Sequence, residues 1–205
     1  MINQNWIYVG VGIQTLGGIG YLIDTLKGRV RPNKVGWLLW SIAPLIAFFA
    51  MIKQGVGPEA WATFIVGFLP MLVFLASFVN KKAYWEITKL DYICGTLSVF
   101  GLILWMITKV GNIAIFFSIV ADALASFLTI YKSYKVPESE SHLVFTLGII
   151  NAAIGLLVIK DWSFQSYAFN LYILVDDILI ASLIITKIGP IIDKKLKSVF
   201  AKAIK

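Results

Sequence analysis

Residues 23–41, IDTLKGRVRPNKVGWLLWS, have a counterpart 105 positions later in residues 128–146, LTIYKSYKVPESESHLVFT. In each copy an apolar segment ends in a basic turn that contains a proline, and a second apolar segment follows. The aligned pairs are Lys27 with Lys132, Pro32 with Pro137, and Ser41 with Thr146. A match at this spacing is typical of one supersecondary unit that occurs twice in a chain.

The composition excludes a water-soluble fold. The chain is 59% hydrophobic and 14% charged, and a soluble domain of 205 residues could not bury that much apolar surface. The single cysteine, Cys94, excludes an internal disulfide, and the single histidine, His142, excludes a histidine-cluster metal site. The chain contains no Gly-rich phosphate loop. We expect an all-α integral membrane protein whose partner is the lipid bilayer, with no cofactor, no metal and no nucleic acid.

The apolar runs are about 20 residues long, which is the length of a bilayer crossing. They predict seven transmembrane helices at residues 6–26, 35–53, 59–79, 89–108, 112–132, 142–160 and 164–186. Because residues 1–5 carry no basic side chain, we expect the first run to be retained rather than cleaved as a signal.

The internal match divides the chain into four parts. Residues 1–80 are the first three-helix repeat, 81–110 the linker with the fourth helix, 111–187 the second three-helix repeat, and 188–205 a basic tail. One linker helix returns the chain to its starting side of the membrane. The two repeats are therefore expected to run parallel, which is one design of membrane transporters.

The basic residues predict the orientation. With the N-terminus outside, 15 of the 18 lysines and arginines lie on the inner side, and Lys53, Lys109 and Lys160 lie outside. The positive-inside rule therefore favours an outer N-terminus and a cytoplasmic C-terminus. The ratio of 16 lysines to 2 arginines is typical of an AT-rich prokaryotic genome. We expect the plasma (inner) membrane of a prokaryote.

Two segments carry patterns for helix packing and for surface binding. The first predicted helix is rich in glycine, which lets backbones approach closely in lipid, and we expect it to pack within its own repeat. The alternative is that glycine is simply common in membrane helices. In the tail, apolar and lysine side chains fall on opposite helical faces. This pattern predicts a helix on anionic lipid of the inner leaflet, and a frayed basic tail is the alternative.

Three aspartates occur within the apolar spans, where a charge costs at least about 2.5–3.5 kcal/mol on insertion scales. Asp122 lies near the middle of the fifth span, on one polar stripe with Ser118, Ser126 and Thr129. Asp177, in the seventh span, shares a helical face with Asn170. The neighbouring Asp176 points about 100° away, and we expect it to make a helix contact.

These stripes allow two interpretations. In the functional one, they face a central cavity in which one or two carboxylates bind a cation, take up a proton or accept hydrogen bonds from a hydroxylated ligand. In the structural one, a protonated aspartate donates to a serine or a carbonyl of a neighbouring helix. Asn151, midway along the sixth span, is a further candidate for the cavity.

Two groups near the inner surface are also candidates. Trp37 and Trp40 share a face of the second span, where they either anchor the helix at the interface or line an inner vestibule. Acidic residues open the sixth span, where they favour the helix dipole. The alternative is an inner gate, in which Glu138 or Glu140 pairs with a basic residue of the first repeat. Its candidates are Lys27, Arg29 and Arg31.

Three helices, a linker and three helices with the N-terminus outside resemble the SWEET sugar transporters, their PQ-loop relatives and the vitamin-precursor transporter PnuC. Residues 128–135, followed by Ser139 and Glu140, are similar to the PQ-loop pattern of basic and aromatic residues before Ser and Glu. Leu128 and Ile23 stand where that pattern has proline. Asn170 matches the pocket asparagine of SWEETs, but its repeat mate is Ile65. The resemblance implies transport by alternating access, but it does not imply that the solute is a sugar.

The resulting hypothesis is a small carrier or facilitator for a modest polar solute such as a sugar or vitamin precursor, with a proton link through Asp122 or Asp177. An intramembrane enzyme acting on a lipid or isoprenoid is one alternative. The chain shows no nucleophile–base pair and no metal-ligand motif for it. A PQ-loop-like sensor or receptor is another. The sequence does not name the solute or the oligomeric state.

Overall fold

The computed structural model describes the chain except for residues 1, 54–58, 84, 109–110, 161 and 204–205. The described residues form α-helices, two short 3-10 helices and connecting turns, and no strand occurs among them. The elements are α1 (Trp6–Leu26), α2 (Lys34–Lys53), α3 (Glu59–Ala76), η1 (Lys81–Ala83), α4 (Lys89–Ile107), α5 (Gly111–Lys135), η2 (Pro137–Ser139), α6 (His142–Leu157), α7 (Phe164–Thr186) and α8 (Ile188–Ala203). Each apolar run expected to cross the membrane coincides with one helix from α1 to α7.

Four stretches of helix are long and apolar enough to cross a membrane. They are Trp6–Leu26, Lys89–Ile107, Ile115–Lys135 and Ser166–Thr186. The described residues of α2, α3 and α6 add shorter apolar stretches, Lys34–Ile46, Phe64–Ala76 and His142–Leu157. Together with large aliphatic and aromatic side chains exposed along the bundle surface, these helices indicate a protein embedded in a membrane.

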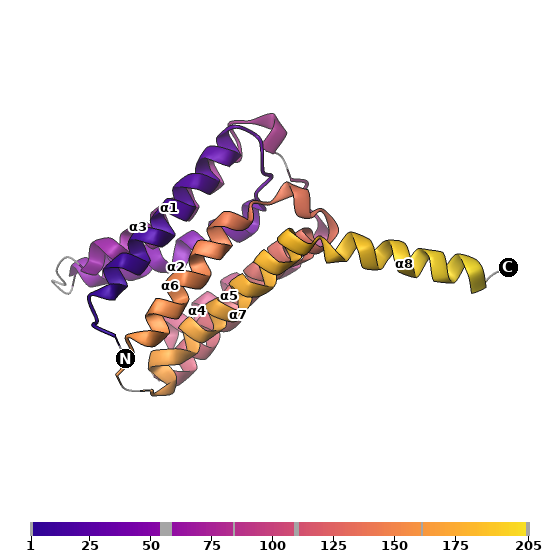
Figure 1. The fold of residues 1–205 in the computed structure, drawn as a ribbon. Helices are drawn as coiled ribbons and strands as arrows, with labels where there is room; N and C mark the ends of the chain where they lie inside the picture. Colours follow the sequence, from indigo (N-terminus) through magenta and orange to yellow (C-terminus); the bar gives the residue numbers. More distant parts are fainter. Residues whose placement is uncertain (1, 54–58, 84, 109–110, 161, 204–205) are drawn as a thin grey trace.

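Six helices pack side by side in a closed ring. The order around it is α1, α3, α2, α5, α7 and α6, and α6 returns to α1. Helix α4 packs on α5 and α2, outside the contact between them. Figure 1 shows the bundle and the extension of α8 away from it.

The first basic turn is shaped by Gly28 and Asn33. Gly28 has φ +68°, a left-handed conformation that favours glycine, and it ends α1. The Oδ1 of Asn33 accepts a hydrogen bond from the Gly36 N–H at 3.0 Å, which caps the start of α2. The Nδ2 of Asn33 donates to Asp91 in the first turn of α4. One asparagine therefore fixes the start of two helices.

The second basic turn packs directly on the first. The Arg31 N–H donates to the Ser139 carbonyl of η2 at 2.8 Å. The prolines of the two turns, Pro32 and Pro137, are both fully buried. The two matching stretches of sequence thus meet at one end of the bundle.

The glycines of α1 pack differently from the expectation. Gly10 lies against Asn151 and Gly17 against Val144, both on α6, whereas Gly18 lies against Leu69 of α3. The prediction that the glycines pack this helix within its own expected repeat is therefore confirmed for Gly18 and wrong for Gly10 and Gly17. The physical reason is that Gly10 and Gly17 are seven residues apart and share a helical face, and the closed ring turns that face toward α6.

Helix α8 continues from α7 after Lys187, which has φ 51°. Its Asp193 accepts hydrogen bonds from Lys135 Nζ at 2.7 Å and from the Tyr134 hydroxyl at 3.1 Å. The Lys135 ammonium, followed by the Tyr134 hydroxyl, holds the pKa of Asp193 below its usual range. The expected helical tail is confirmed as a helix, and this contact ties its first turns to the end of α5.

Candidate solute cavity

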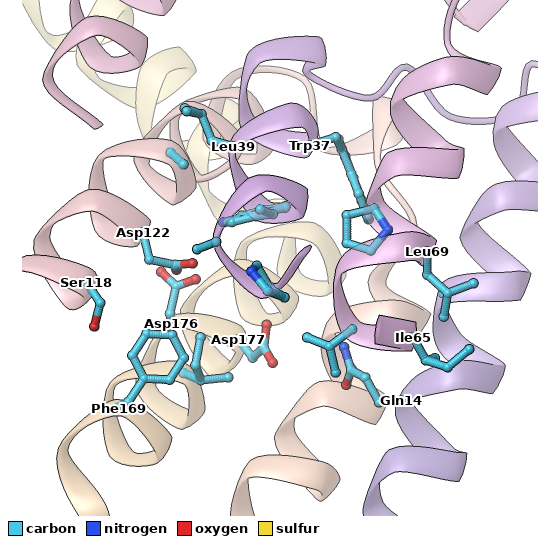
Figure 2. A pocket seen from close by; sticks show the side chains of 18 of the residues that line it. Gln14, Trp37, Leu39, Ile65, Leu69, Ser118, Asp122, Phe169, Asp176 and Asp177 are labelled. Carbon is cyan, nitrogen blue, oxygen red and sulfur yellow. The ribbon is translucent and has the colours of Figure 1, made fainter. Parts of the chain in front are cut away.

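The bundle encloses a cavity of about 740 Å³ that receives side chains from α1 through α7. Most of the described lining is aliphatic or aromatic. The polar exceptions are Tyr8, Gln14, Thr15, Ser98, Ser118, the indole groups of Trp37, Trp40 and Trp105, and the carboxylates of Asp122, Asp176 and Asp177. Figure 2 shows the three carboxylates on α5 and α7 with Gln14 opposite them.

The cavity is placed asymmetrically along the bundle. On α1 its lining begins at Ile7, one residue after the helix starts, and ends at Gly18. On α2 it begins at Trp37, one turn from the basic end. The rings of Trp37 and Tyr21 pack there with centroids 4.5 Å apart. This aromatic pair separates the cavity from the two basic turns.

The three carboxylates have different hydrogen-bond partners. Asp122 accepts from the Tyr172 hydroxyl at 2.8 Å, and Asp176 accepts from the Ser126 hydroxyl at 2.5 Å. No hydrogen bond of the described residues involves the Asp177 side chain. Both hydrogen bonds join α5 to α7, so Asp122 and Asp176 also connect these two helices.

Asp177 and Gln14 approach the same glycine. A Cβ built on Gly148 would collide with Asp177 Oδ2 and would lie 3.3 Å from Gln14 Oε1. Gln14 Oε1 is buried and has no hydrogen-bond partner. Gly148 of α6 therefore leaves room for two acceptor oxygens, from α7 and α1, to converge on one point.

Several expected residues line the cavity. These are Asp122, Asp177, Ser118, Trp37 and Trp40. Asp176 lines it as well, and its bond to Ser126 is the helix contact expected of it.

Other expected residues lie between helices, outside the described lining. Asn170 lies against Gly155 of α6, and Asn151 lies against Gly10 of α1. Ser126 is fully buried at its bond to Asp176. Asn170 and Asp177 share a helical face, as their spacing predicted. That face packs on α6, and of the two residues only Asp177 is among the described lining residues of the cavity.

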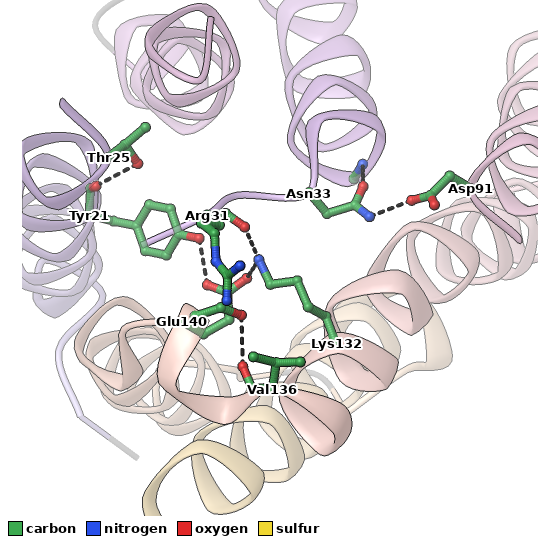
Figure 3. Close-up of polar contacts among 10 residues, drawn as sticks. Tyr21, Thr25, Arg31, Asn33, Asp91, Lys132, Val136 and Glu140 are labelled. Atoms are coloured by element: carbon green, nitrogen blue, oxygen red, sulfur yellow. Dashed lines mark hydrogen bonds and ion pairs between the residues drawn. The ribbon is translucent and has the colours of Figure 1, made fainter. Parts of the chain in front are cut away.

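A buried polar cluster lies beyond Trp37, at the basic end (Figure 3). Lys132 Nζ and Glu140 Oε1 are 2.5 Å apart, and both side chains are 0% exposed. The Tyr21 hydroxyl of α1 donates to Glu140 Oε2 at 2.5 Å, and Lys132 donates to the Arg31 carbonyl. The cluster thus joins α1 and the first basic turn to α5 and η2.

The ion pairs expected for an inner gate are made by other partners. Glu140 pairs with Lys132 of its own repeat, and Arg29 pairs with Asp24 at 3.2 Å on the surface. Glu138 is exposed. Arg31 contributes its carbonyl to Lys132, and its guanidinium lies 5.8 Å from the centre of the Trp85 ring. The reason is that Lys132 and Glu140 are buried side by side, and a buried charge is costly unless an opposite charge lies next to it.

Gln14, Trp105 and Tyr172 are among the residues of the site that were not expected from the sequence. The usable signal for Gln14 is a primary amide in the middle of an apolar span, since such a group needs a partner or a cavity. Tyr172 and Trp105 gave no such signal, because aromatic residues with one polar atom are common throughout membrane helices.

Comparison of the chain with protein-family models, with curated proteins and with solved structures finds no match.

Proposed function

We propose that this chain is a small-solute membrane carrier of seven spans, in which two parallel three-helix repeats alternate access to the central cavity. The observation that carries the proposal is the cavity itself. It lies between the repeats, takes side chains from both, and contains ionisable groups at a depth where they are costly. Sites near the midplane between repeats are typical of secondary transporters.

The order of helices in the ring supports the two repeats. Within the first, α3 packs between α1 and α2. Within the second, α7 packs between α5 and α6. The contacts between the repeats also correspond, since α1 meets α6 and α2 meets α5. This is the pattern expected of one unit used twice around a pseudo-twofold axis.

The buried cluster supports a closed inner side. Tyr21, Glu140 and Lys132 join the two repeats at the basic end, beyond the Tyr21–Trp37 pair that bounds the cavity. On the opposite side the lining extends to Ile7 and Tyr8 in the first turn of α1. In this proposal the structure corresponds to a state with access from the N-terminal side. Opening the inner side requires separation of the cluster.

Proteoliposomes provide the test. A thermal-shift screen of the purified protein against sugars, nucleosides, amino acids and vitamins selects solutes, and counterflow then measures their exchange. The wild type is expected to exchange a selected solute and to accumulate it under a pH gradient. Asp122→Asn and Asp177→Asn are expected to keep counterflow and to lose pH-driven accumulation. Other titratable groups among the described residues are Tyr8 and Asp176 in the lining, and Tyr172 at its bond to Asp122.

Asp193→Asn is the control, because it removes a carboxylate outside the cavity. A selected solute that binds but never exchanges would contradict the carrier and favour a sensor or receptor. Chemical turnover of a solute in detergent, where no gradient exists, would favour an intramembrane enzyme instead.

A further inference from the structure

The described lining of the cavity contains acids without a base. Asp122, Asp176 and Asp177 face it, and no lysine, arginine or histidine is among the described lining residues. The buried cation Lys132 lies beyond Trp37 and is paired with Glu140. Carboxylates that share an apolar space cannot all ionise unless a positive charge joins them. The described lining therefore provides no positive charge beside which these carboxylates could all be ionised.

The small hydroxyl groups of the cavity already donate hydrogen bonds within the protein. Each hydroxyl of Thr15, Ser98 and Ser118 donates to a helix carbonyl, with acceptors at 2.7, 2.8 and 2.7 Å. Those three groups are therefore not free to donate to a solute. A neutral polyol such as a sugar needs donors as well as acceptors from its site. The remaining donors of the described lining are the Tyr8 hydroxyl, the Gln14 amide and the indole N–H groups of the tryptophans.

The lining also contains polar atoms without a partner, of both kinds. Gln14 Oε1 is buried without a partner, and Asp177 Oδ2 converges with it on Gly148. A carboxylate and an amide at one point can receive an ammonium N–H, which supplies both a donor and a positive charge. Trp37, 4% exposed, has an unpartnered indole Nε1 on the same cavity, which can take an acceptor atom of the solute.

The walls of the cavity fit a solute whose positively charged group is attached to an apolar body. Trp37, Trp40 and Trp105 line the cavity together with Phe169, among aliphatic side chains from several helices. Aromatic faces attract organic cations, most strongly where water is excluded. An inorganic cation would instead need several oxygen ligands around one point, whereas the acidic groups here are spread over two helices and largely surrounded by hydrocarbon.

We propose that the solute of this cavity is an organic cation with an apolar or aromatic body. Its charged group lies among Asp177, Gln14 and the Asp122–Asp176 pair, and its body lies against the tryptophans. This inference rests on the proposed function for the cavity's role as the solute site, and it adds the chemical class of the solute.

Binding of probes matched in shape tests the proposal. 2-Phenylethylammonium, which carries N–H donors, is compared with its neutral isostere propylbenzene, and 3-phenylpropylammonium is compared with butylbenzene. Quenching of tryptophan fluorescence in the purified full-length protein reports binding, with protein-free micelles as the blank. Each cation is expected to bind at least about tenfold more tightly than its partner. Asp177→Asn and Asp122→Asn are each expected to weaken cation binding by about tenfold.

The controls separate charge from folding. Asp177→Glu keeps the charge and is expected to keep the preference for cations, and Asp193→Asn is expected to bind as the wild type does. Gel filtration reports whether each variant is folded. If a variant does not fold, the paired probes on the wild type still decide the question. The proposal is wrong if neither cation binds, if the isosteres bind equally well, or if both asparagine variants leave the affinity unchanged.

The outcome also distinguishes this inference from the carrier proposal. Preferential binding of cations without exchange in proteoliposomes would retain the cation site and reject the carrier. Exchange of neutral solutes with no preference for cations would retain the carrier and reject the cation.

Discussion

Gly148 is the residue where α6 makes space for the Asp177 carboxylate. A second glycine, Gly155, lies two turns later and faces Asn170, with a built Cβ 3.1 Å from the Asn170 side chain. The two glycines therefore have similar surroundings, a helix packed against a polar residue of α7. They differ in that Asp177 lines the cavity, whereas Asn170 is outside its described lining.

Gly148→Ala is expected to impair solute exchange while leaving stability nearly unchanged. The new methyl group must displace the end of the flexible Asp177 side chain, and it occupies the point where Gln14 converges. Alanine also favours the helix by about 1 kcal/mol over glycine, which offsets part of the strain. We expect counterflow to fall about tenfold or more, measured beside thermal unfolding.

Gly155→Ala is the matched control for that experiment. It adds the same methyl group to the same helix and presses on Asn170 instead. Its exchange is expected to stay close to that of the wild type. Equal losses in the two variants would mean that helix spacing matters and the position of Asp177 does not.

At the scale of elements, the basic end depends on a buried ion pair between Lys132 of α5 and Glu140, the residue that follows η2. Removing one partner leaves a buried charge without compensation, which typically costs about 3–5 kcal/mol. Glu140→Gln and Lys132→Met are each expected to lower stability by that amount. The double variant is expected to be more stable than the sum of the two losses, because it leaves no unpaired charge.

Denaturant or thermal unfolding in detergent measures these losses. The surface pair of Lys135 and Asp193 is the matched control, since both of its side chains are more than a third exposed. Lys135→Met is expected to cost at most about 1 kcal/mol, because exposed ion pairs contribute little. Additive losses for Lys132 and Glu140, or losses as small as that of Lys135, would contradict a coupled buried pair.

The two matching stretches of sequence show why this pair was not expected. Lys27 and Lys132 are equivalent in the two matching stretches, Lys27 directly after α1 and Lys132 near the end of α5, yet Lys27 is exposed and Lys132 is fully buried. The difference comes from neighbours distant in sequence, namely the Arg31 carbonyl, Glu140 and the Trp85 ring, 5.0 Å from the Lys132 ammonium. The local sequence pattern predicts where each helix ends. Whether the lysine near that end is buried depends on the tertiary packing around it.

At the scale of the whole molecule, the hydrophobic pattern predicted the helices well. Each helix must present apolar side chains to lipid or to a neighbouring helix along its full length, so the apolar run and the helix have similar bounds. It predicted the site in part. Asp122 and Asp177 stand out because charge is rare in such segments, and both line the cavity. Asn170 and Asn151 stand out for the same reason but pack between helices. The sequence predicts on which face of its own helix a residue lies. Which neighbouring helix that face contacts depends on how the six helices pack in the ring.

Orientation is a property of the whole chain, and labelling of single cysteines tests it. The native Cys94 is 4% exposed, so the background reaction is expected to be low. Asn5, Lys81 and Lys194 are all exposed and lie before α1, after α3 and within α8. With an outer N-terminus and seven spans, Asn5→Cys is expected to react with a membrane-impermeant maleimide in intact cells. Lys81→Cys and Lys194→Cys should react only after permeabilisation.

The three positions answer separate questions because each follows a different number of crossings. Reaction at Lys81→Cys and Lys194→Cys in intact cells, with Asn5→Cys protected, would reverse the orientation and contradict the positive-inside argument. Reaction of Asn5→Cys and Lys194→Cys on the same side would require an even number of spans. In that case one of the shorter apolar helices α2, α3 and α6 does not cross the bilayer, and two parallel repeats could not enclose a shared cavity.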